Sequence, residues 1–318
     1  MHRCMALSLT LALASFSLND LHAYEQRTDR YKKDNQRNAR QKRLKSEWEW
    51  TQYAFYDLYA ELPNTTANAQ KVYERVANTM KGNRALKAVK GKMREQLLKQ
   101  LQMMNPATHE SAHLLYINLY NDRIHNEVKK KHKNYGSFMY DWGDECSAVF
   151  CETETLKNNR RRQLEKTIPL KEFLVMTHPA IGPNGVEMPS ASSPIARRFY
   201  AQSLAFSEYL RFSGGKPFYR FFMAQSANNV PYTYIFPQWN RLVKALVNNS
   251  TYKRNLKARS ESLFPKSVII NGVRFLPGEM VKEIAPSFEE FEKGFKRWVS
   301  KEFPTHSEPL LVYRVPKK

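Results

Sequence analysis

Two histidines and a glutamate in the stretch ATHESAHLLY, residues 107–116, have the residue types and spacing of a metal site. His109, Glu110 and His113 follow one another in the order H-E-x-x-H. On a helix, residues four apart lie about 40° from each other around the axis, so one Zn²⁺ can bind both imidazoles. Glu110 is well placed to act as the general base toward a water that the metal activates. A solvated helix without any function can also contain this pattern, so a third ligand is needed.

A candidate for that ligand lies in DWGDECSAVFCETE, residues 141–154. Apolar residues recur there at spacings of three and four, as on the buried face of an amphipathic helix: Trp142, Cys146, Val149 and Phe150. Glu145 lies beside this face, and a carboxylate buried there must be paired, protonated or bound to a metal. The alternative is an exposed Asp144/Glu145 pair at a helix start, where acidic residues suit the helix dipole. Glu152 lies two turns further along, so we expect it to affect metal affinity only weakly.

The order of these segments and of later ones resembles the gluzincins of the peptidase MA-like group, which are secreted or membrane-linked zinc hydrolases. After H-E-x-x-H, the similar segments are WGDECSAVF (family pattern W-x-x-E-G-x-A-x-Y/F), IPLKEFL, RRFYAQSLAFSEYLRFSGG and SFEEFEKGFKRWV. The resemblance covers residues 105–300. It implies that His109, His113 and Glu145 are zinc ligands and that Glu110 is the general base.

The distribution of patterns predicts a mainly α fold of the α+β kind. We expect a zincin-like catalytic domain with a helical N-terminal part and a small C-terminal β-hairpin. The predicted division is a signal peptide at 1–23, a basic flexible arm at 24–47, a helical part at 48–104, a zincin-like metal-binding region at 105–235 and a C-terminal helical and hairpin part at 236–318.

Periodicity and turn residues locate the individual elements. Helices are predicted from Trp48 to the PNTT break, over 67–82, 84–104, 195–212 and 288–303, besides the two that carry the candidate ligands. Asn271-Gly272 predicts a two-residue hairpin, and LLVYRV near the end has the composition of a strand. Tyr200, in the helix over 195–212, is a candidate donor to a developing oxyanion, with a plain core role as the alternative.

The start of the chain indicates export. MHRCMALSLTLALASFSLNDLHA has an early arginine, an apolar run from Cys4 to Leu18 and a polar stretch ending in Ala23, as in secretory signal peptides. The run is short for a bilayer span of ~20 residues. We therefore expect a mature protein that begins near Tyr24 and is secreted or periplasmic, with a retained signal anchor as the alternative. Cys146 and Cys151, five apart on one predicted helix, are not expected to form a disulfide with each other.

The charge balance favours anionic surroundings. The chain has 51 Lys and Arg against 30 Asp and Glu, a net charge of +21. Residues 24–45 carry nine Lys or Arg with one Glu and two Asp and show no apolar period, which predicts a flexible arm or a solvated helical lead-in. No zinc finger, P-loop or RNA-binding aromatic signature accompanies the arm, so it indicates no specific nucleic-acid function.

Two functions fit these features. The resemblance implies a secreted zinc peptidase that acts on a polypeptide, with Glu110 taking a proton from water and passing it to the leaving amine. The alternative is a non-catalytic zincin-like protein that binds an anionic surface or polymer through residues 24–47. A binding protein has no need of a general base, so the presence of Glu110 favours the enzyme.

Overall fold

A computed structural model describes residues 46–81, 90–91, 106–121, 141–164, 166–176, 178–179, 194–228 and 230–303. The chain divides into two compact units, residues 1–50 and 51–318, and only the last five residues of the first unit are among those described. The predicted signal peptide and basic arm lie outside the described residues, apart from the end of the arm. So do the LLVYRV strand and the predicted helix over 84–104, except for residues 90–91.

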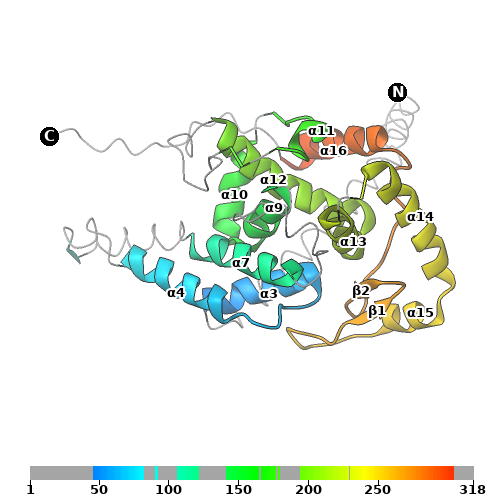
Figure 1. The fold of residues 1–318 in the computed structure, drawn as a ribbon, viewed down its shortest axis with the longest axis horizontal. Helices are drawn as coiled ribbons and strands as arrows, with labels where there is room; N and C mark the ends of the chain where they lie inside the picture. The colour runs from blue at the N-terminus through cyan, green and yellow to red at the C-terminus, as the bar shows by residue number, and fades with distance from the viewer. Residues whose placement is uncertain are drawn as a thin grey trace, which may run out of the picture. The chain divides into compact units, whose positions relative to one another are not determined.

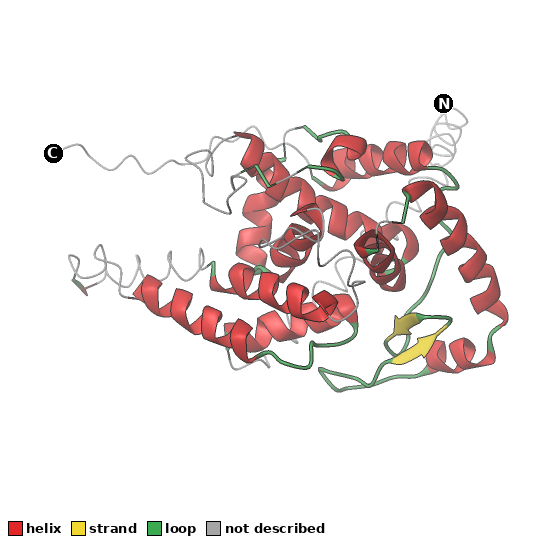
Figure 2. Cartoon of the chain, in the orientation of Figure 1, coloured by secondary structure: helices red, strands yellow, loops and turns green. Residues whose placement is uncertain are grey.

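The described residues are mainly helical with one small hairpin, as the sequence predicts (Figures 1 and 2). The helices are α3 (Glu47–Tyr59), α4 (Ala67–Lys81), α7 (Ala107–Asn121), α9 (Asp141–Cys151), α10 (Glu154–Gln163), α11 (Leu170–Phe173), α12 (Pro194–Gly214), α13 (Lys216–Ala227), α14 (Tyr232–Asn248), α15 (Ser250–Lys257) and α16 (Phe288–Glu302). The strands are β1 (Val268–Ile270) and β2 (Val273–Phe275). Within this part of the chain, no helix has the length and apolar character needed to cross a bilayer.

Helix α9 lies at the centre of the helical packing. It packs against α7 on one side and α12 on another, while α4 covers α7, and α10 and α13 pack on α12. Every residue of α9 after Asp141 is buried. Its apolar residues meet an aromatic core, where Trp142 contacts Phe173, Phe206 and Phe222. A helix buried on all sides fixes its polar side chains tightly, because each must find a partner inside the protein.

Polar contacts fix α9 against its neighbours. The hydroxyls of Ser147 and Tyr59 lie 2.5 Å apart, and the Ser207 hydroxyl donates to the Cys146 carbonyl at 3.1 Å. The Cys146 thiol donates to the carbonyl of Ser203 at 3.3 Å. Cys146 and Cys151 are both buried and form no disulfide with each other, as their spacing predicts.

The C-terminal part is built around the predicted hairpin. Strands β1 and β2 pair antiparallel with Ile270 opposite Val273, so Asn271 and Gly272 form the two-residue turn. Both turn residues have positive φ, 50° and 78°, which is the geometry that an Asn-Gly turn of type I′ requires. Buried side chains from α14, α15 and the hairpin form one small core: Leu246, Tyr252, Ile270, Val273 and Phe275.

Candidate metal centre

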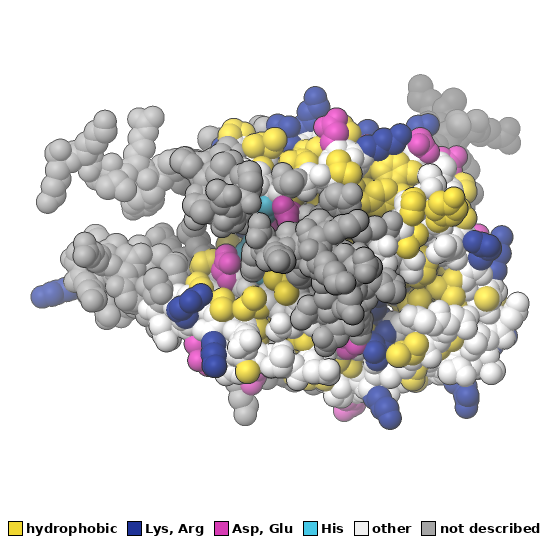
Figure 3. Space-filling view, viewed as in Figure 1, with side chains coloured by type: hydrophobic (Ala, Val, Ile, Leu, Met, Phe, Trp, Pro, Cys, Tyr) yellow, Lys and Arg dark blue, Asp and Glu magenta, His cyan; other side chains and the backbone are white. Residues whose placement is uncertain are grey.

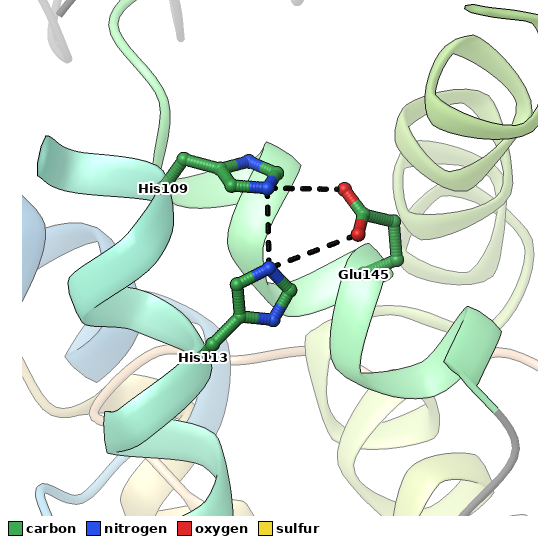
Figure 4. A group of neighbouring side chains, drawn as sticks. All are labelled: His109, His113 and Glu145. Atoms are coloured by element: carbon green, nitrogen blue, oxygen red, sulfur yellow. Dashed lines mark hydrogen bonds and ion pairs between the residues drawn. The ribbon is translucent and has the colours of Figure 1, made fainter. Parts of the chain in front are cut away.

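Three buried side chains converge between α7 and α9. Figure 4 shows His109 and His113 projecting from α7 toward Glu145 on α9. The Nε2 atoms of the two histidines are 3.1 Å apart, and Nε2 of His109 is 3.4 Å from Oε1 of Glu145. Nε2 of His113 is 3.7 Å from Oε2 of Glu145. These three residues can therefore hold one metal ion.

The local sequence accounts for this arrangement. Pro106 precedes α7 and accepts a hydrogen bond from the Glu110 amide at 2.9 Å, so proline occupies a helix start, where its missing N–H costs nothing. The helix is regular from Ala107 onward, and its spacing of four residues aligns His109 with His113. The predicted ligand helix and its buried face are confirmed, and Glu145 lies among its buried residues.

The separations match those expected around a small divalent cation. A tetrahedral ion with ligand bonds of about 2.0–2.1 Å holds its ligand atoms about 3.3 Å from one another. Glu145 is 0% exposed, and neither of its oxygens has a hydrogen bond in the described part of the chain. An ionised carboxylate in that position requires a cation or a donor, because its burial otherwise costs several kcal/mol. The exposed Asp144/Glu145 pair considered from the sequence is excluded, since Asp144 is only 6% exposed.

Each imidazole has a carboxylate at its other nitrogen. Nδ1 of His109 lies 3.1 Å from Oε1 of Glu152, and Nδ1 of His113 lies 2.8 Å from Oδ1 of Asp144. Burial would raise the pKa of Glu152, but His109 and Arg160 lower it, so this group is a carboxylate that can only accept. The Nδ1 atom of His109 then carries the proton, which leaves Nε2 free to bind a metal, as in carboxylate–histidine–metal triads.

Glu152 lies closer to the cluster than its distance from Glu145 along the chain suggested, because its carboxylate contacts His109. The weak effect on metal affinity expected from the sequence stays a prediction. Seven residues make almost two full helical turns, so Glu152, just after the end of α9, projects on the same side as Glu145. This seven-residue spacing is the signal from which the sequence could have predicted that Glu152 lies near the cluster. Asp144 had no comparable signal, because its contact depends on how α9 packs against α7.

The buried groups of the cluster shift one another's pKa values. Burial opposes ionisation of Glu145, but the neighbouring histidines, above all His109, outweigh it and lower the pKa to about 2. Burial also opposes a charge on His113, yet the carboxylates of Asp144 and Glu145 raise its pKa to about 10. Carboxylates thus surround the two imidazoles and favour positive charge between them, which suits a divalent cation that displaces protons on binding.

Three further residues lie beside the cluster. Glu110 is exposed, whereas both histidines of its motif are buried. A few histidine atoms are still visible at the surface in Figure 3. Tyr200 is half-buried, with its ring centroid 6.0 Å from that of His109. His178, which the sequence did not single out, has Nε2 3.4 Å from Oε2 of Glu145 and its ring 5.4 Å from that of Tyr200. Its backbone N–H donates to Asp141 at 2.5 Å, which holds it at the start of α9.

The structure therefore brings His109, His113 and Glu145 together as a possible metal site, with Tyr200 beside them and Glu110 exposed next to His109 along α7. Comparison with protein-family models, with curated proteins and with solved structures finds no match for this chain. The class that fold and site define is a mainly helical protein with a buried His-His-Glu group able to hold a metal ion.

Proposed function

We propose that this protein is an exported zinc peptidase whose metal site is His109, His113 and Glu145. The observation that carries the proposal is the convergence of three buried ligand atoms, with a carboxylate behind each imidazole. Two histidines and one carboxylate leave a fourth coordination position open, which is the arrangement of catalytic rather than structural zinc. The resemblance of the ordered segments to gluzincins supports the same assignment.

In this proposal, Glu110 and Tyr200 have separate roles beside the metal. When bound, zinc supplies Lewis acidity toward the scissile carbonyl and activates water. Glu110, exposed next to the buried ligands, accepts the proton from that water and returns it to the leaving amine. Tyr200, at the edge of the cluster, donates a hydrogen bond to the oxygen that gains charge.

The decisive test compares the wild type with Glu110→Gln for zinc content and for cleavage of a broad peptide library. Gln keeps the shape of Glu but cannot accept a proton, so zinc content and folding should persist while the rate falls about 10²- to 10⁴-fold. Glu74→Gln is the control, because Glu74 is an exposed helical glutamate on α4, outside the cluster. Equal cleavage by wild type and Glu110→Gln would remove Glu110 from the mechanism.

A second candidate, binding to an anionic surface or polymer, rests on a different observation. Residues 241–266, on α14, α15 and the segment after it, display seven exposed cations: Arg241, Lys244, Lys253, Arg254, Lys257, Arg259 and Lys266. Within the part of the chain that the structure describes, none of these seven takes part in an ion pair. Glu261 is the one acidic residue among them, so seven cations and one carboxylate leave six positive charges.

Figure 3 shows Lys and Arg side chains projecting where α14 and α15 lie. We refer to the seven cations as the basic surface. Such a surface attracts polyanions without the arm at 24–47, and it is compatible with catalysis. A wild type that holds zinc but cleaves no peptide in the library would favour binding as the main function.

A further inference from the structure

The two imidazoles of the metal cluster are held in different ways. Asp144, behind His113, lies within α9 next to the ligand Glu145, so the helix itself positions it. Glu152, behind His109, lies one residue beyond Cys151, where α9 ends. The Glu152 amide donates to the Val149 carbonyl at 3.3 Å, which holds its backbone and not its side chain, so another group must hold the carboxylate in place.

That group is Arg160, which lies two turns into α10. Its Nη2 donates to Oε1 of Glu152 at 2.8 Å and its Nε donates to Oε2 at 3.3 Å. The two contacts engage both carboxylate oxygens with one planar guanidinium, a geometry that fixes direction as well as distance. Glu152 is 1% exposed, so no competing solvent contact weakens this pair.

The same guanidinium also contacts the edge of the cluster. The central carbon of Arg160 lies 4.5 Å from the ring centroid of Tyr200, within the range of a cation–π contact. Tyr200 in turn lies with its ring 6.0 Å from that of His109. Contacts therefore run in a closed circuit from His109 to Glu152, to Arg160, to Tyr200 and back to His109.

We propose that Arg160 is a positioning residue that orients His109 through Glu152 and holds Tyr200 beside it, and thereby sets how fast the site releases its metal. This inference rests on the proposed metal site. Its alternative is that Arg160 only neutralises a buried carboxylate. Lysine separates the two roles, because it keeps the charge but can neither grip both oxygens nor stack flat on a ring.

The experiment compares Arg160→Lys with Arg161→Lys. Arg161 is a matched control, because it lies next along α10 and pairs with Glu208 on α12, away from the two imidazoles. Each variant is loaded with Co²⁺ as a spectroscopic probe, and release to excess chelator is followed through the visible absorption. Arg160→Lys should release Co²⁺ about 10- to 100-fold faster than wild type, the range for loss of an outer-shell contact, with an altered Co²⁺ spectrum. Arg161→Lys should match wild type in both.

A second measurement needs no metal. In metal-free protein labelled with ¹⁵N-histidine, the proton on Nδ1 of His109 should be protected from exchange by Glu152 in wild type and in Arg161→Lys. It should exchange faster in Arg160→Lys. Glu152→Gln provides a second variant, and the double variant should release Co²⁺ no faster than the faster single variant, because both changes break one circuit.

The outcomes separate the two proposals. If wild type takes up no metal, the proposed function fails, while the exchange of the His109 proton still decides whether Arg160 positions it. If Arg160→Lys behaves like Arg161→Lys in every measurement made, Arg160 is only a charge partner and the inference is wrong. Thermal unfolding of all variants confirms that the comparison is between folded proteins.

Discussion

The metal cluster and the basic surface use charge in opposite ways. In the cluster, the histidines and carboxylates are buried, and the carboxylates that contact the two imidazoles come from α9 and the residue just after it. On the basic surface, seven cations are exposed, and the stretch 241–266 that carries them contains one acidic residue, Glu261. Buried charges must be matched within the protein, whereas exposed ones remain solvated and can stay unmatched.

This contrast shows where each region can bind something. The two histidines and Glu145 converge on a point that suits one small cation, so affinity there depends on atomic distances. The exposed cations are spread over two helices and a following segment, so affinity there depends on their number and on salt. A single substitution in the cluster should therefore change metal affinity strongly. Substitutions on the basic surface should weaken polyanion binding in steps, according to the number of charges removed.

The largest expected effect is loss of a metal ligand. Glu145→Gln replaces a buried carboxylate with an amide, and zinc affinity should fall on the order of 10²- to 10³-fold, since structural zinc sites share about 10–16 kcal/mol among their ligands. Glu208→Gln is the control, because Glu208 on α12 pairs with Arg161 of α10 and is not one of the three candidate ligands. Zinc competition with a coloured chelator measures both. Unchanged affinity in Glu145→Gln would show that the cluster does not bind zinc through this residue.

The sequence predicted the elements better than the contacts between them. Apolar spacing located α12 and α16 within two residues at each end, and Asn271-Gly272 located the hairpin turn, because these signals are local. The three candidate ligands followed from spacing within two helices. Arg160 and His178 could not be found that way, since their contacts depend on how α10 and the residues before α12 pack around the cluster.

The next largest effect concerns the carboxylates behind the imidazoles. Asp144→Asn and Glu152→Gln should each lower zinc affinity about 10- to 100-fold, because either change removes the charged carboxylate that lies against an imidazole. The measurement is the same chelator competition. Glu154→Gln, which changes a carboxylate at the start of α10 that pairs with Lys157 and Arg161, should have no effect. Equal affinities in all three variants would mean that orientation of the imidazoles is unimportant.

A smaller and graded effect is expected on the basic surface. Replacing Arg241, Lys244 and Lys257 together with Gln should lower the salt concentration that elutes the protein from immobilised heparin, because each lost contact reduces the salt dependence of binding by about one unit of slope. The control replaces Lys293, Lys296 and Lys301 on α16 with Gln, where four glutamates balance four cations. If the control elutes as early as the test variant, retention reflects net charge and not this surface. Zinc affinity should be unchanged in both.

The smallest effect tests whether the two regions are independent. Gly272 has φ of 78° in the hairpin turn, and nothing lies within 4 Å of a Cβ added there, so any substitution acts through the backbone alone. Gly272→Ala should lower the free energy of unfolding by about 1 kcal/mol, and Gly272→Asn by less, because Asn adopts the left-handed region more readily. Denaturant unfolding measures the free energy of unfolding, and chelator competition measures zinc affinity in the same samples. Since the hairpin shares its small core with α14 and α15 and not with α7 or α9, zinc affinity should stay at the wild-type value. A fall in zinc affinity that accompanies the loss of stability would show instead that the hairpin core, on which α14 and α15 pack, is energetically coupled to the metal cluster.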